Sequence, residues 1–281
     1  MLDVIIDALI DSLKIFPFIL LIYIIMEGIE HAKNKRAIER ALSGACAPIA
    51  AGVLGVVPEC GFAVMCAKLY DKGLIKVGTL IAAFLAISDE GLIILLSEGA
   101  DVTSVIMLLA VKIVYAVAIG EAVNLLFAKK DDAHRCPEKD DCIECGKHNE
   151  KPLDIFFLHP LTHAVKIFLY VLAVNVAFGV LLFFIGEDNV TAFLNKSFYV
   201  QPLITSLIGL VPNCGSSIIL SEAYIKGAVT FSGLLAGLTA NSGVGMLILL
   251  RNGKNFKKAV FIALSVYLLA VALGYISFLF A

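Results

Sequence analysis

The sequence predicts an all-α integral membrane protein with about ten membrane segments in two inverted five-helix repeats that contain broken or re-entrant helices. Three observations predict this class: 60% of the 281 residues are hydrophobic, apolar segments recur at a fixed spacing, and polar breaks interrupt these segments at matching places. A mean hydropathy of +0.93 means more apolar surface than one water-soluble core can bury, which excludes a soluble enzyme. The net charge of −2 gives no basic field for nucleic acid.

The long apolar segments come in two kinds. A helix that crosses the bilayer needs about 20 mostly apolar residues, and 12–30, 102–127, 155–185 and 259–281 meet this length without interruption. The apolar segments 42–98 and 199–250 are interrupted by GVVPECGF, AISDEGLI, GLVPNCGS and LTANSGVG. These four interruptions predict broken or re-entrant helices. The first residues lack the basic region and cleavage site of a signal peptide, so we expect the chain to enter the bilayer uncleaved.

An internal repeat divides the chain. An offset of 154 positions aligns 48–99 with 202–253 without a gap, matching Pro58-Glu59-Cys60-Gly61 with Pro212-Asn213-Cys214-Gly215. With a two-residue adjustment, Lys14-Ile15-Phe16 matches Lys166-Ile167-Phe168. We therefore expect a first repeat at 1–128, a polar loop at 129–154 and a second repeat at 155–281.

Positive charge predicts the orientation of the repeats. One topology places 17 of the 22 Lys and Arg on the cytosolic side, including the six of the 129–154 loop, and leaves Lys14, Lys196 and Lys226 outside. The amino terminus is then external, and each repeat crosses the membrane an odd number of times, which inverts the halves. Inverted repeats with broken helices are typical of secondary transporters. The alternative is a helical bundle in which Pro and Gly are tolerated kinks.

The breaks hold the candidate substrate-binding residues. Acids lie in the first repeat and amides at or beside the matching places of the second, with hydroxyls and one thiol from each half; the set is Glu59, Cys60, Ser88, Asp89, Glu90, Asn213, Cys214, Asn241 and Ser242. Ionisable side chains cost at least ~2.5–3.5 kcal/mol at the bilayer centre, so they indicate function. Mixed oxygen and sulfur ligands suit a divalent transition ion or a thiophilic metalloid. The thiols are equally explained as small buried apolar side chains.

Lys112 lies in the middle of the apolar run VIMLLAVKIVYAV. It is a candidate ion-pair partner of Asp89 and Glu90, and its displacement by a cation or a proton would couple binding to conformational change. The same charge could instead hold an anionic substrate at half-helix amino termini.

Two further groups of candidate metal ligands lie toward the cytosolic side. One combines Glu27 and His31 with His159 and His163, each pair spaced i, i+4; polar helix ends at the headgroups are the alternative explanation. The other is the loop set Cys136, Cys142, Cys145 and His148. Four N/S ligands favour Zn or another transition metal, and the alternative is a charged linker with reduced thiols. We expect no cofactor to be required.

The sequence resembles the ten-helix heavy-metal exporters of bacteria and archaea, whose members are labelled arsenic efflux proteins or manganese transporters. The resemblance covers nearly the whole chain and rests on MEGIEH, VVPECGF, AISDEGLIILLS, HAVKIF, QPLITSLIGLVPNCGSS and NSGVGMLILLR. It implies two five-helix halves that expel metal or metalloid ions. The first break more often reads Pro-Gln-Cys in that family; here Glu59 adds a carboxylate, which would favour a cation over neutral arsenite.

These features together predict an exporter of a divalent transition-metal ion, manganese first, in the prokaryotic cytoplasmic membrane. No Walker A loop, H-E-x-x-H or G-x-S-x-G motif occurs, so we expect proton antiport rather than ATP hydrolysis and no enzymatic activity. The alternative cargo is an arsenical or a small organic anion. The G-x-x-x-G at Gly233 and Gly237 leaves open whether it packs within one subunit or between two copies of a homodimer.

Overall fold

The computed structural model describes residues 44, 46–55, 60–71, 73–88, 90–98, 100–131, 198–211, 214–251 and 256–280, with single positions in 9–20 and 161–180. Over this part of the chain the secondary structure is α-helical apart from one short 3-10 helix, and no strand is present. The predicted all-α class is confirmed for these residues.

Ten α-helices are described, five in each predicted repeat. The first five are α3 (Ala47–Leu54), α4 (Cys60–Asp71), α5 (Val77–Ala86), α6 (Glu90–Ser97) and α7 (Val102–Asp131). The second five follow η3 (Phe198–Val200) and are α10 (Gln201–Gly209), α11 (Cys214–Ile225), α12 (Phe231–Ala240), α13 (Gly243–Arg251) and α14 (Phe256–Phe280). Two predicted boundaries move: α7 continues four residues past 127, into the expected loop, and α14 begins three residues before 259.

The helix boundaries recur at the offset found in the sequence. Adding 154 to the bounds of α4 and α5 gives the bounds of α11 and α12 at both ends, and α3 and α7 begin 154 residues before α10 and α14. The four interruptions read from the sequence therefore fall between helices, as predicted.

The turns after α4 and α11 are built alike. Gly73 and Gly227 have φ of 69° and 73°, a left-handed conformation that glycine adopts without a steric penalty. In the first turn Leu74 N–H donates to Leu69 O and Gly73 N–H to Tyr70 O; in the second, Ala228 and Gly227 bond to Ala223 and Tyr224 in the same pattern. This is a Schellman cap, which ends both helices at matching residues.

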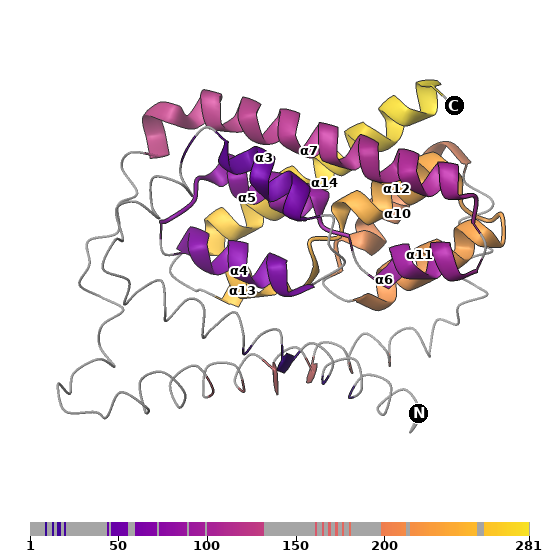
Figure 1. Cartoon of the computed structure of the whole chain (residues 1–281), viewed down its shortest axis with the longest axis horizontal. Coiled ribbons are helices and arrows are strands. Elements are labelled where there is room, and N and C mark those ends of the chain that lie inside the picture. The colour runs from indigo at the N-terminus through magenta and orange to yellow at the C-terminus, as the bar shows by residue number, and fades with distance from the viewer. Residues whose placement is uncertain are drawn as a thin grey trace.

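The eight short helices form two bodies (Figure 1). The first body contains α3, α4, α5 and α13, and the second contains α6, α10, α11 and α12; the long helices α7 and α14 extend past both. Each body therefore takes three helices from one repeat and one from the other. The pairs α4 with α13 and α6 with α11 make this exchange, and the two pairs are equivalent under the 154-residue offset.

Each body has its own hydrophobic core. One core gathers buried side chains mainly of α4, α5, α13 and α14, such as Phe84 and Leu247, and the other those of α6, α7, α11 and α12, such as Leu95 and Leu235. The ring of Tyr115 packs against both cores. Buried polar side chains, among them Lys112, Ser88 and Ser242, belong to neither core.

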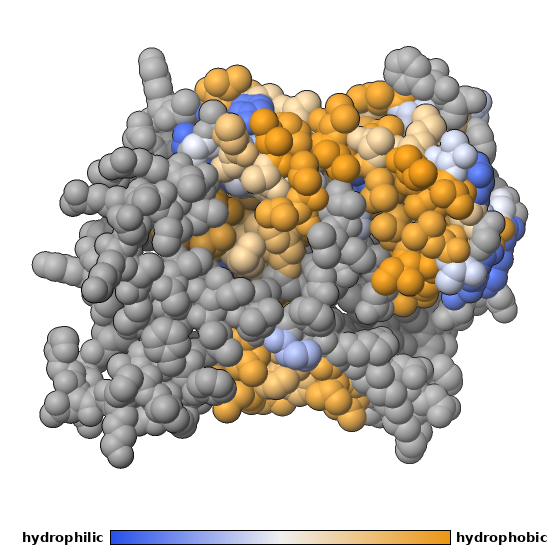
Figure 2. Space-filling model, in the orientation of Figure 1, coloured by the Kyte–Doolittle hydropathy of each residue, from blue (hydrophilic) through white to orange (hydrophobic). Residues whose placement is uncertain are grey.

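Helix length and exposure are those of a membrane protein. Within the described residues, Val102–Leu126 and Phe256–Phe278 are long and apolar enough to span a bilayer, and α12 with α13 forms a third candidate span bent by 41°. Apolar side chains cover much of the described surface (Figure 2), and Val114, Leu125 and Leu126 on α7 are 70–80% exposed. Such a surface suits lipid rather than water.

Candidate functional site

The breaks of the helices contact one another. Ser88, just after α5, donates its N–H to the carbonyl of Gly55, just after α3, at 2.9 Å. In the second repeat, Gly209 at the end of α10 lies directly against the backbone of Gly237 in the last turn of α12. The two breaks of the first repeat are therefore in contact, and in the second repeat the end of α10 contacts the last turn of α12.

Lys112 joins the breaks of the two repeats. Its ammonium donates to the carbonyl of Ile87 at 2.6 Å and to that of Leu238 at 2.9 Å, and the residue is only 2% exposed. Ile87 is the C-cap of α5, and Leu238 lies two residues before the end of α12. Carbonyls at a helix carboxyl terminus have no helical partner and carry the negative end of the helix dipole, which explains why a buried cation is stable here.

Two serines lie at equivalent positions in these breaks. Ser88 and Ser242, separated by the repeat offset, are 4% and 1% exposed. Neither hydroxyl has a hydrogen-bond partner. An unsatisfied buried hydroxyl costs about 1–3 kcal/mol, and Ser206, Ser221 and Thr239 also have buried hydroxyls without a partner.

The side chain of Asn241 makes a hydrogen bond within the turn that joins α12 to α13. Its side-chain oxygen accepts the N–H of Gly243 at 3.0 Å, at the start of α13, and the residue is fully buried. One lone pair of this predicted ligand is thus used to fix the turn between α12 and α13.

The remaining predicted substrate ligands are placed only in part. Cys60, Glu90 and Cys214 are the first residues of α4, α6 and α11; their side chains, and Glu59, Asp89 and Asn213 altogether, lie outside the described residues. Each thus stands at, or within two residues of, a half-helix amino terminus. The first N–H groups of a helix have no helical partner, so these termini offer hydrogen-bond donors.

The predicted cytosolic metal ligands lie outside the described residues; they are Glu27, His31, His159, His163, Cys136, Cys142, Cys145 and His148. Among the residues that the structure does describe, no group of three or more His, Cys, Asp or Glu side chains is close enough to hold a metal.

Sequence reasoning placed the breaks but missed the contacts of Lys112. The two carbonyls that bind it belong to Ile87 and Leu238, apolar residues whose side chains give no sign of a polar role. The one signal in the sequence is that each apolar run ends near these residues, since a helix that ends there leaves its last carbonyls without a helical partner.

The two exchanged helix pairs differ in polarity. A Cβ at Gly91 on α6 would lie 2.8 Å from Ser217 O and 2.9 Å from Ser221 Oγ on α11, so these helices touch closely. The equivalent contact sets Gly245 of α13 against Ala63 of α4, at 2.6–2.8 Å. Ser217 and Ser221 thus stand where the other pair has Ala63 and Ala67. The α6–α11 contact is lined by hydroxyls and the α4–α13 contact by methyl groups.

The G-x-x-x-G motif packs within the chain. A Cβ on Gly233 would approach Gln201, and one on Gly237 would meet Leu220 of α11 and Thr205 of α10. The alternative of a subunit contact left open by the sequence is therefore not needed to explain these glycines.

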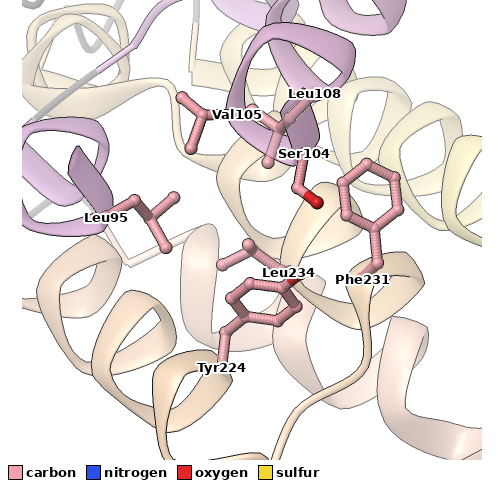
Figure 3. Close-up of a pocket in the computed structure, with 7 residues that line it drawn as sticks. All are labelled: Leu95, Ser104, Val105, Leu108, Tyr224, Phe231 and Leu234. Atoms are coloured by element: carbon pink, nitrogen blue, oxygen red, sulfur yellow. The ribbon is translucent and has the colours of Figure 1, made fainter. Parts of the chain in front are cut away.

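An apolar hollow lies away from the breaks (Figure 3). It is lined by Leu95, Ser104, Val105, Leu108, Tyr224, Phe231 and Leu234. Ser104 and Tyr224 are the lining residues that carry a hydroxyl, and the other lining side chains are aliphatic or aromatic.

These features define a multi-span membrane protein with two helical bodies joined by broken helices and by a buried lysine. A family model described as "Putative, 10TM heavy-metal exporter" matches residues 1–185 and 164–280. The chain belongs to this family, and the resemblance read from its motifs is confirmed. Comparison with curated proteins and with solved structures found no significant match. This description of the family favours transport over enzymatic activity.

Proposed function

We propose that this protein is a secondary-active transporter that exports a divalent transition-metal ion, manganese first, by alternating access. The observation that carries the proposal is the contact of Lys112 with the ends of α5 and α12. It brings broken helices of both repeats to one buried point, where the acids, amides and hydroxyls of the breaks follow within a few residues.

Two contacts support an inverted relation of the repeats. The Tyr115 hydroxyl donates to Leu269 O at 2.8 Å, and Leu269 is the equivalent of Tyr115 under the 154-residue offset. The rings of Phe16 and Phe168, matched in the sequence, lie 5.4 Å apart edge to face. Residues that touch their own equivalents lie near a twofold axis. The long helices α7 and α14 run in opposite directions in Figure 1, as inversion requires.

The half-helices support a site at mid-membrane depth. Helices of 8–12 residues, such as α3 and α4, extend about 12–18 Å at 1.5 Å per residue, roughly half of a hydrocarbon core of about 30 Å. Breaks at that depth supply backbone groups and side chains to a polar substrate without exposing them to lipid.

The proposed substrate ligands are the oxygens of Glu59, Asp89, Glu90, Asn213 and Asn241, with Ser88 and Ser242, and the sulfurs of Cys60 and Cys214 as additional soft ligands. Lys112 is the coupling charge: it neutralises the site when cargo is absent and leaves it when the cation binds. Protons exchanged on the acids make antiport the natural energy source, in a cytoplasmic membrane with the amino terminus outside.

The loop cysteines and His148, with the Glu27, His31, His159 and His163 group, would receive metal from the cytosol. Chelation or removal of the loop should then lower the apparent affinity for cargo without abolishing flux.

A panel of cargoes tests the proposal. In inside-out vesicles with an imposed pH gradient, Mn²⁺ and other divalent transition ions should accumulate, and the same ions should raise the melting temperature of the purified protein. Small carboxylates, which the buried positive charge of Lys112 would favour, and neutral arsenite are the competing cargoes. Stabilisation and uptake of these, and not of divalent ions, would replace the metal assignment.

A further inference from the structure

The environment of Lys112 is that of a cation-binding site. Its ammonium contacts two main-chain carbonyls, Ile87 O at 2.6 Å and Leu238 O at 2.9 Å. Both lie at helix carboxyl termini, and they come from different repeats. Unwound carbonyls and half-helix carboxyl ends are the groups that bind coupling cations in transporters with broken helices.

Two buried hydroxyls lie close to these carbonyls along the chain. Ser88 follows Ile87 directly and Ser242 lies four residues after Leu238, and both hydroxyls are buried without a hydrogen-bond partner. Main-chain carbonyl oxygens are neutral, hard ligands, and they bind alkali-metal ions in channels and transporters.

Only one of the two repeats supplies this charge. The equivalent of Lys112 on α14 is Val266, which is fully buried. A single ammonium therefore neutralises carboxyl ends from both halves, as one bound monovalent cation would.

We propose that Lys112 is a tethered cation in a monovalent-cation site formed by the ends of α5 and α12. Given the proposed transport function, the tethered charge makes a free Na⁺ or K⁺ unnecessary for the cycle. Removal of the side chain leaves a site that takes a small free cation.

The test uses the purified full-length chain and compares Lys112→Ala with Lys112→Met. Loss of the ammonium leaves the carbonyls unpaired, so both variants should melt about 5–10 °C below the wild type. Ethylammonium or Na⁺ at tens of millimolar should restore at least half of this loss in Lys112→Ala. Ethanol, a neutral molecule of similar size, should restore none. Lys112→Met should not respond, because its side chain fills the space, and Val266→Ala serves as the control at the equivalent position.

Several results would overturn the proposal: rescue of Lys112→Ala by ethanol as well as by the cations, no rescue by any cation, or wild-type flux that requires Na⁺. If Lys112→Ala does not fold, Lys112→Gln replaces it in the test, because glutamine keeps N–H donors but carries no charge. An unchanged melting temperature in Lys112→Gln would show that the positive charge is not needed. The melting measurements contain no cargo. Cation rescue in a protein that exports no metal would therefore refute the transport function and leave the tethered cation standing.

Discussion

At Ser88 and Ser242, an effect of substitution on folding stability can be distinguished from an effect on transport. Both are buried and unpaired, so their removal deletes no hydrogen bond. Ser88→Ala and Ser242→Ala should keep or slightly raise the melting temperature, since an unsatisfied hydroxyl costs about 1–3 kcal/mol. If these oxygens bind cargo, the KM for Mn²⁺ should rise several-fold.

Flux against Mn²⁺ concentration and thermal unfolding check this pair of variants. Ser265→Ala is the matched control, because its hydroxyl bonds only to Phe261 O along α14. A lower melting temperature with an unchanged KM would show that the serines serve the fold alone.

The sequence predicts which charged residues are buried better than it predicts their hydrogen-bond partners. Lys112 was predicted to be buried and functional because an apolar run surrounds it, and its burial is confirmed. The predicted partners were Asp89 and Glu90; the contacts that the structure adds are the carbonyls of Ile87 and Leu238. Main-chain groups carry no residue-specific signal, so no motif could have named them.

Among the helices, the contacts of α6 with α11 and of α4 with α13 depend on two glycines. An added Cβ at Gly91 or Gly245 would lie under 3.0 Å from backbone atoms of the facing helix, and backbone can yield only if the helices separate. Gly91→Ala and Gly245→Ala should each destabilise the protein by about 1–3 kcal/mol. Thermal or denaturant unfolding in detergent measures the loss.

Gly227→Ala gives the contrast for these variants. Nothing lies within 4 Å of its Cβ position, and only its φ of +73° is strained in alanine, at a cost of about 1 kcal/mol. If Gly91→Ala and Gly245→Ala cost no more than Gly227→Ala, the close packing of the exchanged helices is contradicted.

The helices also show what a repeat in the sequence can and cannot predict. The breaks at GVVPECGF, AISDEGLI, GLVPNCGS and LTANSGVG and the matching helix boundaries followed from Pro, Gly and polar residues at an offset of 154. The exchange of α6 and α13 between bodies did not, because it depends on contacts between residues more than 100 positions apart. Likewise, the sequence does not show that Ser217 and Ser221 face Gly91, so their place in the α6–α11 contact could not be predicted.

For the whole molecule, the distribution of positive charge predicts which side each turn faces. In the proposed topology Asp101 and Lys226 are outside and Lys257 is inside. Asp101→Cys and Lys226→Cys should react with a membrane-impermeant thiol reagent in right-side-out vesicles, and Lys257→Cys only in inside-out vesicles.

The wild-type chain, which carries its own cysteines, including the exposed Cys46, sets the background for this labelling. Labelling of Lys226→Cys and Lys257→Cys from the same side would contradict the topology, since the helices α12 and α13 between them would then not carry the chain across the membrane.

We expect the acids of the first repeat to bind a divalent cation at the breaks, and Mn²⁺ flux in inside-out vesicles is the measurement that depends on this binding. Glu59→Gln and Asp89→Asn keep the size of each side chain and remove its charge, while Glu98→Gln, at the exposed end of α6, is the control. Glu59→Gln and Asp89→Asn, inserted at wild-type levels, should each lose at least 10-fold in flux, about 1.4 kcal/mol, while Glu98→Gln should keep the wild-type flux. Wild-type flux in both break variants would show that these carboxylates do not bind the cargo.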